Sequence, residues 1–160
     1  MIRTILAAAA AALIALPIAV QAGSTSDRAT VEAFYSDLLS NPKGDDLGDR
    51  VRKVVTEDWV SVPTPRGGPG AKGMTKTLAG FGVAIPDLNW EIQEILQDGN
   101  RYIVRSFATG TPVKEVFGVE PKGKSFRVQT IDIHTVENGR ITSSFHVEDW
   151  LRAKYQLSAE

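Results

Sequence analysis

Residues 126–148 read FRVQTIDIHTVENGRITSSFHVE, two runs rich in β-branched and aromatic residues on either side of Asn138-Gly139. Asn-Gly between two such runs is the strongest short-range signal for a β-hairpin, because both residues tolerate the positive φ angles of a tight turn. We therefore predict antiparallel strands over residues 124–136 and 140–149, and these two strands orient the rest of the fold.

A two-residue turn fixes which side chains of the hairpin share a face. Counting outward from Asn138-Gly139 pairs His134 with Ser143 and Asp132 with Phe145. Directly opposed residues lie on the same face of a sheet, and so do residues two apart along a strand. All four side chains are therefore expected on one face, among apolar neighbours.

Asp132 and His134 form the most chemically suggestive pair on that predicted face. Desolvation raises the pKa of a carboxyl group, a nearby imidazolium lowers it, and either group serves as a general base when a substrate proton is in reach. The alternative interpretation is a structurally paired Asp-His on an exposed face. His146 and Glu148 fall on the opposite face, where we interpret them as surface or dimer-contact residues.

Upstream of the hairpin the apolar periodicity is first helical and later alternating. After Pro86 apolar and polar residues alternate, and Asp98-Gly99-Asn100 is a turn signal between two strands. Helices followed by antiparallel strands favour an α+β fold, with the helices covering one face of a curved sheet. The expected elements are helices near 27–39, 47–55 and 74–81, a Pro/Gly-rich loop over 61–73, strands starting at 88 and 101, and a short tail over 150–157.

Composition limits the possible functions of the 160-residue chain. Eighteen basic residues face nineteen acidic ones, so a strongly basic nucleic-acid surface is not expected. The chain has no Cys and two His, which argues against thiol catalysis, disulfides and Cys- or His-rich metal sites. We expect no metal, no organic cofactor and no nucleic-acid partner.

Residues 1–22 have the pattern of a secretory signal peptide. Arg3 precedes a short apolar core, Pro17 interrupts it, and small residues lead to Ala22. We predict cleavage after Ala22, a secreted or periplasmic mature domain over residues 23–160, and no stable membrane insertion afterwards. An uncleaved membrane anchor is the alternative, although the apolar core is short for a bilayer span.

Several common catalytic motifs are missing from the sequence. The glycines at 67, 68 and 70 are not followed by the Lys-Ser/Thr of a phosphate-binding loop, and no Gly-x-Ser-x-Gly motif is present. Asp132, His134 and Ser143 contain the residue types of a hydrolase triad, but a flat hairpin supplies no oxyanion hole.

Seven short stretches, in this order and at these spacings, resemble one known family. They are Ile85-Pro86-Asp87-Leu88, Asp98-Gly99-Asn100-Arg101, Thr109-Gly110-Thr111, residues 117–124, Ile131-Asp132-Ile133, residues 137–141 and Glu148-Asp149-Trp150-Leu151. Together they resemble the SnoaL-like polyketide cyclases, also called ester cyclases, of the nuclear transport factor 2-like superfamily.

The resemblance implies a cone-shaped α+β barrel, in which N-terminal helices pack in a curved antiparallel sheet around a deep apolar pocket. It also implies a homodimer through the outer sheet face and an intramolecular aldol closure driven by one acidic residue without a cofactor. Asp132 matches that acidic residue. His134 replaces the usual aromatic residue, and Pro112 replaces the usual His of a Gly-Thr-His stretch.

We therefore expect an exported cofactor-free enzyme of the cyclase, isomerase or hydrolase type. It would act on a hydrophobic carbonyl or ester compound, with Asp132 as general acid/base and His134 as its partner. The alternative is a non-catalytic exported protein that binds a hydrophobic small molecule in the same pocket, and a third hypothesis is an interaction module. The expected substrate-binding residues are Trp59, Phe81, Arg105, Ser143 and Phe145.

Overall fold

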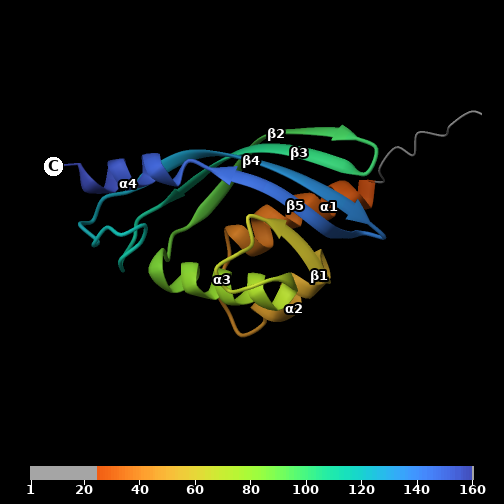
Figure 1. Ribbon diagram of the computed structural model, residues 1–160, viewed down its shortest axis with the longest axis horizontal. Helices are drawn as coiled ribbons and strands as arrows, with labels where there is room; N and C mark the ends of the chain where they lie inside the picture. The colour runs from red at the N-terminus through yellow and green to blue at the C-terminus, as the bar shows by residue number, and fades with distance from the viewer. Residues whose placement is uncertain (1–24, 160) are drawn as a thin grey trace, which may run out of the picture.

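Five strands form one curved, unclosed sheet in the computed structural model, which describes residues 25–159 (Figure 1). The strand order is β1-β5-β4-β3-β2; β1 runs parallel to β5, and the other neighbours are antiparallel. The expected α+β cone is therefore confirmed. The strands are β1 (Val55–Val62), β2 (Asn89–Asp98), β3 (Arg101–Gly110), β4 (Phe126–Glu137) and β5 (Arg140–Glu148).

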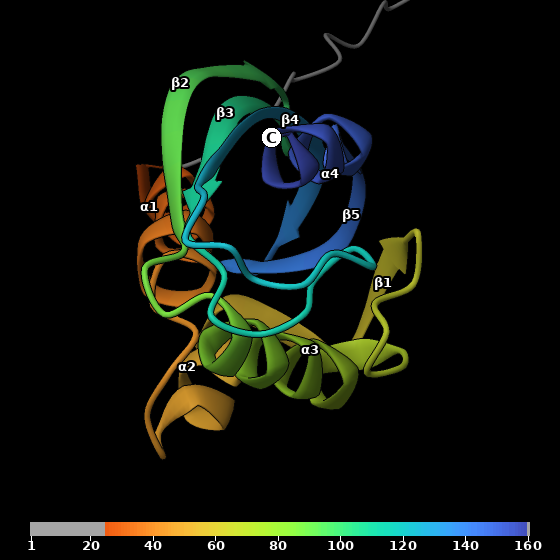
Figure 2. The ribbon, with the colours of Figure 1, turned by 90° about the vertical axis from the view of Figure 1, so that its left-hand side faces the viewer.

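The helices lie against the concave side and one end of this sheet, as the view along the curved strands shows (Figure 2). Four of them are α-helices, and η1 continues α1 as a π-helical segment. α3 packs beside β1 and α2, and α4 packs on β4. The bounds are α1 (Thr25–Ala33), η1 (Phe34–Leu39), α2 (Leu47–Val54), α3 (Gly70–Ala84) and α4 (Trp150–Ser158).

The first helical segment carries two aromatic rings to the inner face of the sheet. Val31, Phe34, Tyr35 and Leu38 recur at helical spacing and are all buried. The Phe34 ring centroid lies 4.8 Å from that of His134 on β4. This packing joins the N-terminal helix to the central strands of the sheet.

Two elements differ from the sequence-based expectations. β1 was expected only as part of a connection, because its exposed Glu57 and Asp58 interrupt the apolar alternation and its register with β5 is irregular. The expected tail over 150–157 is the helix α4. The Asp149 carboxylate caps α4 by accepting a hydrogen bond from the backbone N–H of Arg152 at 3.0 Å.

The expected register of the 126–148 hairpin is wrong beyond its first pairs. Val136 pairs with Ile141 as expected, but Thr135 pairs with Ser143, which leaves Thr142 as an extra residue in β5. Such a β-bulge shifts the pairing by one residue, and because side chains alternate, it exchanges the two faces of the strand beyond it.

Because of the bulge, residues 143–148 of β5 point to the faces opposite to those predicted. Asp132 lies opposite His146, and His134 lies opposite Ser144. The interpretation of His146 and Glu148 as surface or dimer-contact residues is therefore wrong, because both line the interior cavity described below. Ser143 and Phe145 lie on the outer face instead.

The predicted signal peptide over residues 1–22 lies outside the described residues. Within residues 25–159, no helix combines the length and the apolar character that crossing a membrane requires.

Candidate functional site

A cavity of about 670 Å³ lies between the concave face of the sheet, α3 and the loops that follow β1 and β3. This volume is in the range that accommodates a small organic ligand. The cavity combines an aromatic lining with one polar wall. The aromatic lining residues are Phe34, Trp59, Phe81, Trp90, Phe117 and Trp150, and the polar wall consists of Ser61, Asp132, Ser144, His146 and Glu148.

Asp132 is the buried acid of the polar wall. Its side-chain Oδ2 is inaccessible to solvent and has no hydrogen-bond partner. Burial raises the pKa of Asp132 from 3.8 to about 7, and the charge of Glu148 adds to this, against the lowering effects of Tyr35, His146 and Thr130. Asp132 therefore exchanges a proton near neutral pH, as a general acid/base requires.

His134 lies behind the cavity lining in a chain of buried hydrogen bonds. Its Nδ1 is 2.8 Å from the Ser144 Oγ, and its Nε2 is 2.9 Å from the Tyr35 hydroxyl. The indole N–H of Trp59 donates to the same Ser144 Oγ at 3.1 Å. Burial lowers the pKa of His134 to about 3, so the imidazole is neutral. His134 therefore holds Tyr35 and Ser144 in place beside Asp132.

A second acid–base group occupies the polar wall beside Asp132. The His146 Nδ1 lies 2.6 Å from the Glu148 Oε1, and the His146 Nε2 lies 3.0 Å from the Ser61 Oγ. Burial alone lowers the pKa of His146, but the hydrogen bond and charge of Glu148 outweigh it and raise the pKa overall. His146 is thus an oriented imidazole with a carboxylate partner.

Asp132, His146 and Glu148 are the residue types that ligate metals. In the described part of the chain, one ligand atom from each lies within 4.8 Å of the other two. Two ligands of one zinc ion are typically about 3 Å or more apart, since each is about 2 Å from the metal. The 2.6 Å separation of the His146 and Glu148 atoms is instead that of a charge-assisted hydrogen bond.

The residues expected to bind substrate divide into two groups. Trp59 and Phe81 line the cavity. Arg105, Ser143 and Phe145 lie on the outer face, and Arg105 is ion-paired there with Glu94 at 3.4 Å. The misplacement of Ser143 and Phe145 follows directly from the bulge.

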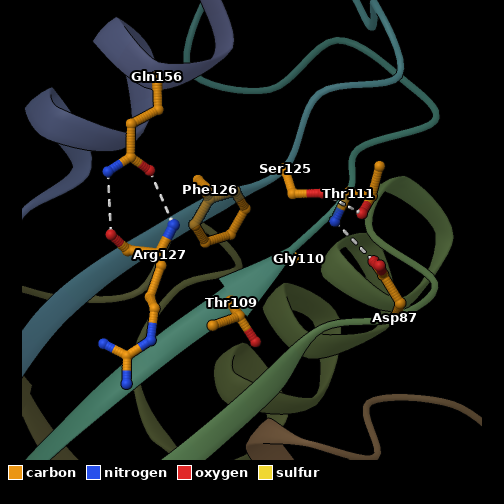
Figure 3. A pocket seen from close by; sticks show the side chains of 8 residues that line it. All are labelled: Asp87, Thr109, Gly110, Thr111, Ser125, Phe126, Arg127 and Gln156. Atoms are coloured by element: carbon orange, nitrogen blue, oxygen red, sulfur yellow. Dashed lines mark hydrogen bonds between the residues drawn. The ribbon is translucent and has the colours of Figure 1, made fainter.

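A second, smaller cleft of about 460 Å³ lies where β3 ends and β4 begins (Figure 3). The polar groups that line this cleft form hydrogen bonds mainly with one another. The backbone N–H of Thr111 donates to the Asp87 carboxylate at 2.7 Å, and the Gln156 amide bonds both backbone groups of Arg127. We therefore place the candidate site in the larger cavity, where Oδ2 of the buried Asp132 has no hydrogen-bond partner.

Comparison with known proteins identifies one family and one fold. The family model described as SnoaL-like polyketide cyclase matches residues 29–157. No curated protein matches the chain.

Solved structures with this fold share low sequence identity with the chain. TsrD from Streptomyces laurentii is 20% identical with a TM-score of 0.75, covering 88% of this chain and 100% of its own. IdmH from Streptomyces antibioticus is 23% identical with a TM-score of 0.70, covering 83% and 99%. A SnoaL-like polyketide cyclase from Agrobacterium tumefaciens is 21% identical with a TM-score of 0.68, covering 84% and 100%. At these identities the similarity establishes the fold.

The raised pKa of Asp132 predicts that the carboxyl group makes stability depend on pH. The folded state binds the proton more tightly than the unfolded state, so this contribution is fully present below pH ~4 and is lost as pH rises through about 7. Relative to Asp132→Asn, the wild-type free energy of unfolding should fall by at most ~4 kcal/mol between pH 4 and 8. Urea denaturation at several pH values measures this difference.

The exposed Asp98 at the end of β2 offers a matched control for that measurement. Asp98→Asn should follow the wild-type dependence on pH. If the stability difference between wild type and Asp132→Asn stays constant over this range, the Asp132 carboxyl group does not have a raised pKa.

Proposed function

The chain belongs to the SnoaL-like polyketide cyclase family, and we propose that it is an exported cyclase- or isomerase-type enzyme in which Asp132 transfers protons. The proposed substrate is a hydrophobic compound with a carbonyl or ester group. The proposed chemistry uses the side chains of the cavity without a metal or organic cofactor.

The burial of Asp132 supports this proposal most directly. Asp132 lines a cavity that six aromatic side chains also line, and its Oδ2 is buried without a hydrogen-bond partner. A bound substrate would therefore be shielded from water beside a carboxyl group whose pKa is raised to about 7. A general base is most effective when its pKa lies near the working pH. Strongly perturbed pKa values cluster at functional sites.

In the proposed step, the Asp132 carboxylate removes a proton from the carbon next to a carbonyl group. The C–H electron pair then forms the enolate, and the neutral Asp132 carboxyl returns a proton to the enolate or to the product oxygen. Tyr35, held by His134 at 2.9 Å, influences the charge of Asp132 without entering the cavity lining. We therefore propose His134 as a positioning residue for the acid/base.

The alternative is a protein that binds a hydrophobic small molecule without converting it. The same aromatic lining supports this alternative, because binding needs the cavity but not the titration of Asp132. The two alternatives differ in whether the protein transfers protons, so proton transfer is the property to measure.

Exchange of carbon-bound hydrogen provides that measurement. 2-Tetralone, an aromatic ketone with acidic α-protons, should exchange them for deuterium in D₂O faster with the protein than without it, as followed by proton NMR. Asp132→Asn should lower the protein-catalysed rate by about 100-fold or more, because the variant lacks the general base. The wild-type rate should rise with pH through about 7 as the carboxylate forms.

Asp98→Asn is again the matched control and should keep the wild-type exchange rate. Binding of 2-tetralone without catalysed exchange would favour the non-catalytic alternative. Full exchange activity in Asp132→Asn would exclude Asp132 as the base.

Export rests on the pattern of residues 1–22. A basic start, a short apolar core and small residues before the predicted cleavage point are typical of signal peptides. Protein isolated from its native cells should begin at Gly23 by intact mass and should be found outside the cytoplasm. A cytoplasmic protein that retains residues 1–22 would contradict export.

We also propose that the outer face of β1, β4 and β5 forms a homodimer interface. Phe145 is 47% exposed and Val147 66% exposed, although large apolar residues of this kind are usually buried. The pairing of the three strands brings several such residues together, and contiguous exposed apolar patches commonly mark interfaces. This outer patch consists of Val60, Val62, Ile131, Phe145 and Val147.

Sedimentation analysis tests the outer patch. Wild-type protein should sediment as a dimer, and Phe145→Glu should sediment as a monomer because it places a charge in the apolar interface. Val83→Glu, at an exposed apolar position on α3, should remain dimeric. A wild-type monomer, or a dimeric Phe145→Glu variant, would contradict an interface at this patch.

A further inference from the structure

The end of β1 places a serine beside the His146–Glu148 pair. Ser61 pairs with Ser144 across the parallel β1–β5 ladder, and its side chain is on the concave face. The Ser61 Oγ lies 3.0 Å from His146 Nε2, while His146 Nδ1 lies 2.6 Å from Glu148 Oε1. All three residues line the cavity. A hydroxyl, an imidazole and a carboxylate in this order form the nucleophile–base–carboxylate arrangement of serine hydrolases.

We propose that Ser61, His146 and Glu148 form a catalytic triad that hydrolyses esters of hydrophobic acids inside the cavity. This activity goes beyond the proton transfer assigned to Asp132, because it forms a covalent bond to a different residue. It also differs from the Asp132, His134 and Ser143 combination considered from the sequence. Ser143 lies on the outer face, whereas Ser61 comes from a strand that the sequence did not predict.

The proposed reaction begins with the transfer of the Ser61 hydroxyl proton to His146 Nε2 as Oγ bonds to the ester carbon. The carbonyl π electrons move to oxygen, and the tetrahedral adduct collapses with cleavage of the bond to the leaving alkoxide. His146 gives its proton to that alkoxide, which leaves as an alcohol. Water then attacks the acyl-Ser61 carbonyl in the same way, and the acid and free Ser61 are regenerated.

The surroundings of His146 favour the charged imidazolium that forms in this reaction. Glu148 is an ion-pair partner at Nδ1, and the backbone carbonyl of Pro63, 3.2 Å from Nε2, can accept the new N–H. The Ser61 Oγ also lies 2.9 Å from that carbonyl. The single Ser61 hydroxyl proton can point to either the Pro63 oxygen or His146 Nε2. In the reactive arrangement it points to His146, and the Pro63 oxygen accepts the new Nε2–H after proton transfer.

Asp132 offers a proton donor for the negative oxygen of the tetrahedral adduct. It lies opposite His146 in the β4–β5 ladder, and its Oδ2 has no hydrogen-bond partner. A carboxyl group that stays neutral in an apolar site can donate a hydrogen bond to a developing oxyanion. Asp132 would thus act as the oxyanion-hole donor that a flat hairpin alone does not provide.

The cavity lining indicates the substrate class. Six aromatic side chains line the same cavity as the triad, so the acyl or alcohol part of the ester should be aromatic or otherwise hydrophobic.

Covalent labelling tests the nucleophile without knowledge of the natural substrate. Phenylmethylsulfonyl fluoride, an aromatic reagent for activated serines, should add one phenylmethylsulfonyl group to the full mature chain by intact mass. Peptide mapping should locate it on Ser61. Ser61→Ala should remain unlabelled, and His146→Gln should be labelled about 100-fold more slowly or worse, because the general base is missing.

Ser36→Ala is the matched control, because Ser36 is an exposed serine on η1 whose hydroxyl bonds Asp37. It should be labelled like the wild type. Circular dichroism checks that Ser61→Ala folds. An unlabelled wild type, a label on another residue, or continued labelling of Ser61→Ala would overturn the proposal.

The pH dependence of labelling tests the role of Glu148 as a positioning residue. Labelling should rise with pH as His146 loses its proton, and Glu148→Gln should move the midpoint to lower pH, because the carboxylate no longer raises the pKa of His146. Asp132 on β4 also raises the pKa of His146, and buried His134 on β4 interacts with it electrostatically; both are present in both proteins, while β1 contributes the Ser61 hydroxyl. An unchanged midpoint would show that Glu148 does not orient and charge His146.

Labelling uses no ketone, and the 2-tetralone exchange measurement uses no ester or acylating reagent. Ser61 labelling without exchange would support the triad and not the proton-transfer function of Asp132. Exchange without Ser61 labelling would support Asp132 and overturn the triad.

Discussion

One extra residue in β5, Thr142, determines which side chains face the cavity. The bulge lies next to the Asn138-Gly139 turn and shifts the β4–β5 pairing by one position. A shift of one residue exchanges the faces of a strand, so Ser144, His146 and Glu148 all turn inward together. The polar wall of the site therefore depends on a local irregularity of the backbone.

The shift in pairing buries polar side chains, which costs free energy unless they form hydrogen bonds inside the protein. Buried polar groups destabilise a fold unless they find partners. The hydroxyl of Ser144 bonds both His134 and Trp59, and the hydroxyl of Thr130 bonds Ser106 at 2.6 Å. Oδ2 of Asp132 has no such partner. Among the five residues of the polar wall, Asp132 alone has a buried side-chain atom without a hydrogen-bond partner, as expected of a site that meets a ligand.

Periodicity and turn chemistry predicted the α+β class and the Asn-Gly hairpin, whereas the cone and the role of Asp132 came from the family resemblance. The sequence could not predict the roles of His146 and Ser61. Polar residues at 144, 146 and 148 alternate with apolar Phe145 and Val147, and this pattern favours an inward-facing Phe145. Turn residues carry no information about a bulge three positions away. β1 was missed because its pairing with β5 is irregular and non-local.

Asp132 and His146 are cross-strand neighbours, so neither group titrates independently of the other. Glu148 acts on both: its negative charge raises the pKa of Asp132 by repulsion and that of His146 by attraction. Protons are therefore retained on the polar wall up to a higher pH than either residue would hold them in water. The polar wall therefore holds a proton donor, Asp132, beside the imidazole of His146 near neutral pH. The two residues come from the adjacent strands β4 and β5. The relative position of those strands is again set by the single bulge at Thr142.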